Sequence, residues 1–388
     1  MKLAIVTETF PPEINGVAMT FGVIAGELGR RGHSVAVYRP WRSDLPARGI
    51  PADYRQIAMA GLPIPGYPLL RIGLPAGRKL RRIWSRERPD LVHVATEGPL
   101  GISAVRAARA LGIPVTSSFH TNFHAYAKHY RVSPFRSVAL GWLRHVHNLT
   151  QRTFAPTQDL CAELSDLGFR NLSVLSRGVD TRQFRPERRS NALRGEWKAG
   201  PADPVVIHVG RMAVEKNYPL LFRAYSAMRQ ANPACRFVLA GEGPLKRRLT
   251  REHRDCIFAG FFSRDEIGRY YASADIYVHA SVTETFGNVL TEAMASGLAA
   301  AGFDYAAARM FVRDGETGLS VPLGQPDRLV EAAVRLATDS PLRSRLRIAG
   351  RAAVEAQSWD KVIAHFESDL ENTAGVPHPA ATPSPVPA

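Results

Sequence analysis

Two glutamates eight residues apart, Glu284 and Glu292, carry the strongest chemical signal in the chain, in the segment Glu284-Thr-Phe-Gly-Asn-Val-Leu-Thr-Glu292. A turn signal follows Glu284, and helix-spaced apolar residues come after it, which predicts a loop and then a helix. The N-terminus of such a helix attracts an anion such as a diphosphate. Glu292 is then expected about two turns into the helix, roughly 12 Å along its axis. One carboxylate would meet one end of an elongated ligand and the other a distant hydroxyl pair; two glutamates on a solvated helix face are the alternative.

Three more loops have residue types suited to the same ligand. Asn15-Gly16-Val17 offers a glycine where a backbone can approach closely, although an ordinary tight turn looks the same. The loop Gly210–Lys216 places Arg211 and Lys216 after an apolar run, where a guanidinium fork and a point charge suit a diphosphate; a solvated basic loop is the alternative. The loop Ala240-Gly241-Glu242-Gly243-Pro244 permits a tight turn, but its Gly-x-Gly pattern is weak alone.

The elements that position these loops are short apolar runs alternating with helix-like segments. Strands are predicted at Lys2–Thr7, Ser34–Tyr38, Leu91–Val94, Pro114–Phe119, Val205–Val209, Arg236–Ala240, Cys256–Ala259, Ile276–His279 and Ala299–Phe303, and a helix at Gly16–Arg31. This alternation predicts the α/β class, with two Rossmann-like domains facing each other across a cleft, and ligands at the carboxyl ends of the strands. The predicted parts are an acceptor-side domain (1–180), a linker (181–200), a donor domain (201–358), a helix returning to the first domain (359–373) and a disordered tail (374–388).

Composition limits the class of protein. No apolar run in the 388 residues reaches the roughly 18–20 residues of a membrane-spanning helix. The N-terminus is read as a buried strand and not as a signal peptide. Cys161, Cys235 and Cys256 have neither disulfide-framework nor zinc spacing, which fits a reducing cytoplasm.

The net charge of +15 is unevenly placed, because residues 1–185 carry +13 of it. Such asymmetry suggests an anionic partner, nucleic acid or membrane, although a genomic bias toward arginine gives the same pattern. No nucleic-acid-binding signature is present, so no nucleic-acid partner is expected. A basic cluster, Arg78, Lys79, Arg81 and Arg82, precedes Trp84, whose ring is expected at a membrane interface.

Six segments in this order carry a family resemblance: Asn15-Gly16-Val17, Ser118-Phe119-His120-Thr121-Asn122, Arg177-Gly178-Val179-Asp180, Gly210-Arg211 with Lys216, Ala240-Gly241-Glu242-Gly243-Pro244, and Glu284 to Glu292. Together they resemble the family-four retaining glycosyltransferases of the GT-B architecture. His120-Thr121-Asn122-Phe123 with Tyr126 and Tyr130 further resembles the lipid-modifying mannosyl-, glucosyl- and sulfoquinovosyltransferases. At Ala306-Ala307-Ala308-Arg309 the chain departs from the family, which often has paired glycines there, close to the donor sugar.

The resemblance implies the role of each candidate site residue. Catalytic roles fall to His120, Glu284, Arg211 and Lys216. Donor-binding roles fall to Gly16, Gly241, Glu242, Phe286, Gly287, Asn288, Val289 and Glu292. Acceptor-binding roles fall to Asn122, Tyr126 and Tyr130, the two tyrosines sharing a helix face that either lines a groove or packs in the core.

The expected reaction is transfer of a hexose, with retention of configuration, from a GDP- or UDP-linked sugar to a lipid headgroup or glycan. No cofactor and no metal are expected, because Arg211, Lys216 and a helix N-terminus supply the positive charge and no Asp-x-Asp motif is seen. The protein is expected in the cytoplasm, peripherally on the inner face of the cytoplasmic membrane. A sugar-nucleotide epimerase of the same architecture and a noncatalytic nucleotide-sugar-binding protein remain alternatives.

Overall fold

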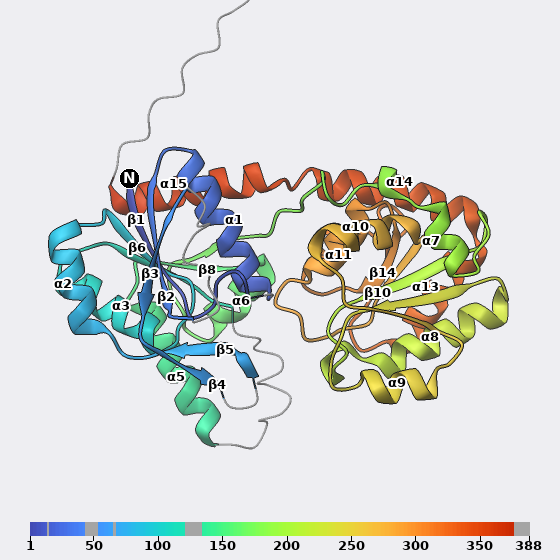
Figure 1. Cartoon of the computed structure of the whole chain (residues 1–388), viewed down its shortest axis with the longest axis horizontal. Coiled ribbons are helices and arrows are strands. Elements are labelled where there is room, and N and C mark those ends of the chain that lie inside the picture. The colour runs from blue at the N-terminus through green and yellow to red at the C-terminus, as the bar shows by residue number, and fades with distance from the viewer. Residues whose placement is uncertain (14, 43–52, 65–66, 121–133, 376–388) are drawn as a thin grey trace, which may run out of the picture. The chain divides into compact units, whose positions relative to one another are not determined.

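The structure is a computed structural model that describes residues 1–13, 15–42, 53–64, 67–120 and 134–375 (Figure 1). The described residues form two compact units. The first contains residues 1–120, 134–176 and 360–375, and the second contains residues 177–359. Each unit is built on its own sheet with helices against it, which confirms the predicted α/β class with two Rossmann-like domains.

The first unit has a seven-stranded parallel sheet in the order β3-β2-β1-β6-β7-β8-β9. Its strands are β1 (Lys2–Val6), β2 (Ser34–Pro40), β3 (Arg55–Met59), β6 (Leu91–Val94), β7 (Val115–Ser118), β8 (Arg152–Ala155) and β9 (Leu172–Val174), beside a hairpin of β4 (Gly61–Ile64) and β5 (Tyr67–Gly73). Its helices include α1 (Gly16–Arg30), α2 (Gly77–Glu87), α3 (Pro99–Ala110), α5 (Pro134–Asn148) and α6 (Gln158–Asp166). The strands β1, β6 and β7 are buried along nearly their whole length, as expected for a parallel sheet covered on both faces, although β7 carries Thr116, Ser117 and Ser118.

The second unit has a six-stranded parallel sheet in the order β12-β11-β10-β13-β14-β15. Its strands are β10 (Val205–Val209), β11 (Arg236–Ala240), β12 (Ile257–Gly260), β13 (Ile276–His279), β14 (Ala299–Phe303) and β15 (Leu319–Val321). Its helical segments are η1 (Pro186–Arg188), α7 (Asn191–Glu196), η2 (Val214–Lys216), α8 (Tyr218–Ala231), α9 (Lys246–Glu252), α10 (Arg264–Ser273), α11 (Asn288–Ala295), α12 (Ala307–Phe311), α13 (Pro326–Thr338) and α14 (Ser340–Glu355).

The segment 181–200, expected to be a linker, is a folded part of the second unit. Leu193 and Trp197 of this segment are buried in the core with the strands of the sheet. Arg194 is buried as well, and its guanidinium contacts the carboxylate of Asp275. The polar residues that suggest a linker therefore include an arginine that is bound inside the second unit.

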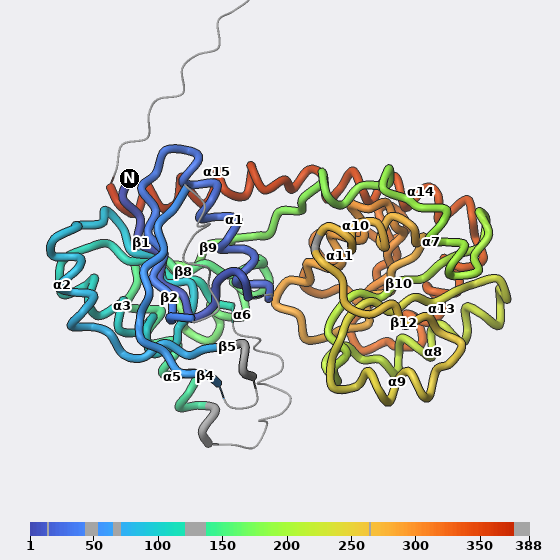
Figure 2. The backbone as a smooth tube through the Cα atoms, viewed as in Figure 1, coloured from blue at the N-terminus to red at the C-terminus, as the bar shows by residue number. Residues whose placement is uncertain are grey.

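The last helix, α15 (Trp359–Ala374), belongs to the first unit, and Figure 2 traces the chain into it from α14 of the second unit. Its Phe366 packs edge-on against His93 and Phe154, and its Asp369 pairs with Arg152. The predicted tail 374–388 lies, from residue 376 onward, outside the described residues.

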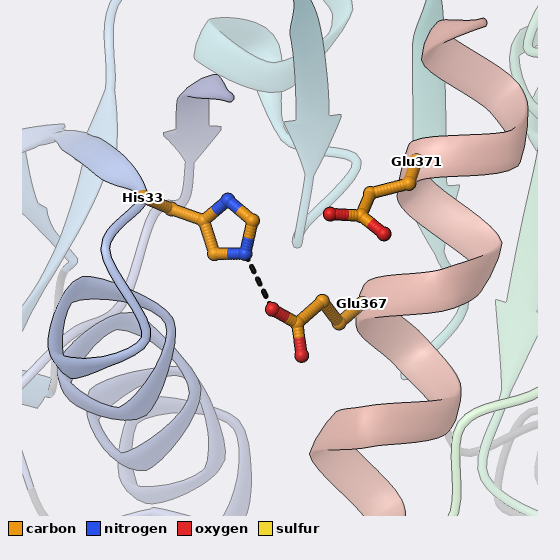
Figure 3. Close-up of side chains that lie close together, drawn as sticks. All are labelled: His33, Glu367 and Glu371. Atoms are coloured by element: carbon orange, nitrogen blue, oxygen red, sulfur yellow. Dashed lines mark hydrogen bonds and ion pairs between the residues drawn. The ribbon is translucent and has the colours of Figure 1, made fainter. Parts of the chain in front are cut away.

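A small polar cluster also fixes α15 to the first unit (Figure 3). His33 Nε2 lies 2.5 Å from Glu367 Oε1, and Arg31 Nη1 lies 2.7 Å from Glu367 Oε2. Glu371 lies one helical turn further along α15, and its carboxylate lies near the His33 imidazole and the Glu367 carboxylate, with one nitrogen or oxygen atom of each within 4.8 Å of the others. Because Arg31 already neutralises Glu367, the cluster is an ion-pair network that holds the helix against the first unit.

Trp84 does not lie where the sequence suggested. Its ring is fully buried in the core of the first unit and packs edge-on against Tyr38, with ring centroids 5.6 Å apart. The expectation that Trp84 sits at a membrane interface is therefore wrong, because Leu80 and Trp84 form the inward face of α2. Within the described ranges, no helix has both the length and the apolar character needed to span a membrane.

Candidate functional site

The loops that follow β10 and β11 touch through their backbones at two points, Gly241 against Gly210 and Gly243 against Met212. Gly241 has φ of +145°, and a Cβ atom there would lie 2.0 Å from the Gly210 carbonyl oxygen. Gly243 has φ of +156°, and a Cβ there would lie 2.5 Å from the Met212 carbonyl oxygen. These positions require glycine because two backbones pass in contact and because L side chains avoid such φ values. The Gly-x-Gly pattern thus has a structural reason that is independent of any ligand.

An ion pair at the carboxyl ends of the strands joins two of the predicted catalytic residues. Lys216 Nζ lies 2.5 Å from Glu284 Oε1, and the two side chains are only 18% and 16% exposed. Lys216 ends η2 after β10, and Glu284 lies in the loop after β13, so neighbouring parallel strands deliver them to one edge of the sheet. The hydroxyls of Ser281 and Thr283 both donate to the Glu215 carbonyl at 3.3 Å and hold this loop against η2.

The electrostatics of this pair are set by burial and by one cation. Burial alone raises the pKa of Glu284, but the Lys216 ammonium outweighs burial and holds the pKa below its usual value. Burial lowers the pKa of His208 to about 3 and that of His279 to about 4, so both imidazoles are neutral at pH 7. Lys216 is therefore the cation that keeps the Glu284 carboxylate ionised in a mostly buried place.

His208 and His279 were not singled out from the sequence, although both lie at strand ends where ligands of α/β sheets bind. His208 stacks on Tyr277 with an interplanar angle of 8°, and its edge meets Tyr218. Among the described residues, neither ring nitrogen of this buried histidine has a hydrogen-bond partner. The sequence signal that could have identified them is a histidine near the end of each apolar run, β10 and β13, just before a loop.

The second glutamate lies closer to the start of its helix than expected. Helix α11 begins at Asn288, so Glu292 is about one turn in, roughly 6 Å along the axis and not 12 Å. The residue before the helix, Gly287, has φ of +103°, and within the described part of the chain no side chain caps the first turn. The Glu292 carboxylate accepts a hydrogen bond of 3.4 Å from the Tyr271 hydroxyl, which fixes its direction.

The other donor-side candidates fall into two groups. Asn288 and Val289, in the first turn of α11, are partly exposed and available to a ligand. The ring of Phe286 is buried against Phe311, so this residue can offer only its backbone. Arg211 does not join the Lys216–Glu284 pair: its side chain is 55% exposed and pairs with Glu215.

Glu242, in the loop after β11, pairs with Lys246 at the start of α9. This pair is on the surface of the second unit, since half of the Glu242 side chain is exposed.

The candidates in the first unit lie near the carboxyl ends of β1 and β7. Gly16 is the first residue of α1, and the Asn15 side chain caps this helix by accepting from the Ala18 amide at 2.9 Å. His120 follows β7 and its ring contacts Phe21 edge-on at 5.7 Å. Asn122, Tyr126 and Tyr130 lie outside the described residues.

Comparisons with known proteins place both units in one enzyme class. Residues 14–183 match the model described as Glycosyltransferase Family 4, and residues 203–339 match the model described as Glycosyl transferases group 1. A GDP-mannose-dependent alpha-mannosyltransferase from Mycobacterium tuberculosis is 32% identical over 95% of this chain and 97% of its own length. A sulfoquinovosyl transferase from Arabidopsis thaliana is 28% identical over 79% of this chain and 61% of its own length.

Solved structures agree on the fold. Anabaena HepE in complex with UDP superposes with a TM-score of 0.76 at 18% identity, over 96% of this chain and all of that one. At this identity the likeness concerns the fold alone.

Proposed function

We propose that this chain, which belongs to glycosyltransferase family 4 and is a nucleotide-sugar glycosyltransferase of the GT-B fold, moves a hexose to a lipid or glycan acceptor with retention of configuration. The observation that carries the proposal is the mostly buried Lys216–Glu284 pair, which lies just before the N-terminus of α11. GDP-mannose is the first donor to test, since three relatives that match over nearly the whole chain are named for it.

The chemistry of the reaction explains this arrangement. Cleavage of the bond to a nucleoside diphosphate leaves positive character on the sugar and new negative charge on the phosphate. Lys216 and the free N–H groups of α11 would stabilise the departing diphosphate, and the exposed Arg211 would join them by leaving Glu215. Glu284 would meet the sugar hydroxyls, and Glu292 the ribose hydroxyls. His120 would act beside the donor sugar, and Gly16 would contact the diphosphate through its backbone.

A turnover assay tests the proposal. The purified chain is incubated with GDP-mannose, UDP-glucose or UDP-sulfoquinovose and with diacylglycerol or mannosylated lipid vesicles, and the product is analysed by mass spectrometry and by NMR of its anomeric proton. We expect transfer from one donor with the α configuration kept. A free epimerised sugar nucleotide formed without an acceptor would favour the epimerase alternative. Donor binding without turnover on any acceptor would favour the noncatalytic one.

Glu292→Ala should weaken nucleotide binding more than catalysis. Loss of a hydrogen bond between a charged group and the ribose is worth about 1.5–3 kcal/mol, which corresponds to about 10–150-fold in the Kd of the nucleoside diphosphate. Isothermal titration with the diphosphate measures this directly. Glu331→Ala, an exposed glutamate on α13, is the matched control and should leave the Kd unchanged. Equal Kd values for the two variants would remove Glu292 from the nucleotide site.

The basic face of α2 leads to a second expectation, that the first unit docks on an anionic bilayer. Leu80 and Trp84 point into the core, and four basic side chains of the same helix are exposed: Arg78, Lys79, Arg81 and Arg82. Each basic residue near such a surface contributes about 1 kcal/mol, which falls off within a Debye length. Changing all four to glutamine should abolish sedimentation with phosphatidylglycerol vesicles, and added salt should weaken it for the wild type.

The matched control for this prediction is a second basic quartet in the other unit. Four exposed arginines around α9, Arg247, Arg248, Arg251 and Arg254, are changed to glutamine in the same way. Binding to neutral vesicles as strong as to anionic ones would contradict the membrane proposal. So would an equal loss of binding in both quadruple variants, since that would reflect net charge and not the α2 face.

A further inference from the structure

A short turn between β14 and α12 has an unusual backbone. Ala306 has φ of +51° and ψ of −128°, and the residue is only 4% exposed. Other described non-glycine residues with positive φ include Arg88 and Asn217, whose ψ values of 70° and 48° lie in the ordinary left-handed helical region. The combination found at Ala306 favours glycine, so a residue with a Cβ is strained there and must be held by its surroundings.

The surroundings that hold Ala306 are a closed turn. Arg309 Nε lies 3.1 Å from Asp304 Oδ1, and Arg309 Nη2 donates to the Asp304 carbonyl at 2.8 Å. The Asp304 amide donates to the Val321 carbonyl of β15 at 2.7 Å. The Asp304 end of the turn is therefore bound to β15, and the Arg309 end is tied back to Asp304, which closes the turn around the strained residue.

The residues on either side of Ala306 donate hydrogen bonds to the loop that carries Glu284. The Tyr305 hydroxyl donates to the Glu284 carbonyl, and the Ala307 amide donates to the Phe286 carbonyl at 2.8 Å. From the other side, Ser281 and Thr283 donate to the Glu215 carbonyl, as described above. The Glu284 loop is thus fixed from two sides, and one of them passes through the strained residue.

We propose that Tyr305 and Ala306 are positioning residues. Together with Ala307 they form a three-residue latch, Tyr305–Ala307, that holds the Glu284 loop in place and thereby sets the discrimination between donor sugars. The proposal rests on the proposed function, in which Glu284 meets the hydroxyls of the donor sugar. A carboxylate selects among epimeric sugars only when its backbone is fixed, because small displacements cost the hydrogen bonds that distinguish one hydroxyl arrangement from another. The strained geometry at Ala306 directs Tyr305 and Ala307 toward the two carbonyls at once.

Tyr305→Phe removes one hydroxyl and tests the latch. We expect kcat with the preferred donor to fall about fivefold, as for loss of one neutral hydrogen bond. The ratio of kcat/KM between GDP-mannose and GDP-glucose should move toward one, while the Kd of GDP stays unchanged because Glu292 lies outside the latch. Tyr270→Phe, at a half-buried tyrosine of α10, is the control and should change none of these. A Tyr305→Phe variant with the wild-type kcat and donor ratio would overturn the proposal.

Ala306→Gly tests the strain with a readout of opposite sign. Relief of the strain should raise the melting temperature by about 2–4 °C while donor discrimination falls, because the loop gains freedom. The control Ala332→Gly, in the interior of α13, should lower the melting temperature and leave discrimination unchanged. A lower melting temperature for both variants would overturn the latch. A wild-type chain that transfers no sugar would instead overturn the proposed function. The melting temperatures would still show whether the backbone at Ala306 is strained.

Discussion

Lys216→Ala is expected to lower kcat by about 10²–10³-fold, as when one preorganised contact to a developing negative charge is lost. Lys216 is held 2.5 Å from Glu284 at the carboxyl end of β10, so its ammonium is already in place before the reaction begins. The affinity for the intact donor should change less than kcat, because the charge on the diphosphate grows as the sugar departs. Initial rates at saturating donor measure the effect.

The same variant has a second, electrostatic signature. In the wild type the pKa of Glu284 is held below its usual value, so this group stabilises the fold above the unfolded pKa, and the contribution is lost as pH falls through the folded pKa. Without Lys216, burial prevails and raises the pKa of Glu284. The group then favours the fold at low pH, and its contribution is lost as pH rises. The difference in melting temperature between wild type and Lys216→Ala should therefore grow from pH 4 to pH 7.

Two comparisons separate this result from simple unfolding. Lys361→Ala, at an exposed lysine of α15, should retain full activity and the wild-type pH profile. The double variant Lys216→Ala/Glu284→Ala should recover much of the stability that Lys216→Ala loses, because no buried carboxylate remains unpaired. Activity that survives a chelator would agree with charge stabilisation by protein groups. An obligatory divalent metal, or full activity of Lys216→Ala, would contradict the role given to Lys216.

The sheets were predictable because buried parallel strands are continuous apolar runs. Five strands have the predicted bounds: Leu91–Val94, Val205–Val209, Arg236–Ala240, Ile276–His279 and Ala299–Phe303. The others that were predicted differ by one or two residues at an end, as at β1, β2 and β7. The strands that were missed lie toward the sheet edges or are short: β9 and β15 have three residues each, and β8 begins with the polar pair Arg152-Thr153. Pairing with a neighbour stabilises such segments, and a single sequence does not contain that information.

The site was predictable to the extent that topology determines it. Loops after neighbouring parallel strands must meet at one edge, so the approach of Lys216 and Glu284 follows from the strand order. The distance from the start of the helix to Glu292 is shorter than predicted, because the prediction counted every residue from Glu284 onward as helical. In the structure Thr285–Gly287 precede the helix, and the positive φ of Gly287 sets where the helix begins. The contacts made by Tyr305 could not be predicted from the sequence either, because they depend on the φ of Ala306, and alanine carries no turn signal.

The second large effect is expected at Asp275, the residue immediately before β13. Its buried carboxylate receives three guanidinium groups, from Arg194 at 2.9 Å, Arg189 at 3.0 Å and Arg347 at 3.3 Å. It also accepts from the Val205 amide at 3.0 Å, at the start of β10. One side chain thus ties α7, α14 and the central sheet of the second unit together.

Asp275→Ala should destabilise the second unit by about 3–5 kcal/mol, the range seen when one member of a buried ion pair is removed. Arg194 is the reason: its guanidinium is buried, so it cannot regain water when its carboxylate is lost. Urea unfolding is followed by tryptophan fluorescence in a variant in which the three tryptophans of the first unit, Trp41, Trp84 and Trp142, are changed to phenylalanine, so that the signal comes from the second unit and its buried Trp197. The control Asp327→Ala removes the exposed partner of Arg223 and should cost at most about 1 kcal/mol. Equal midpoints for the two variants would mean that backbone carbonyls alone hold the three arginines, and that Asp275 is not the group that stabilises the 181–200 segment.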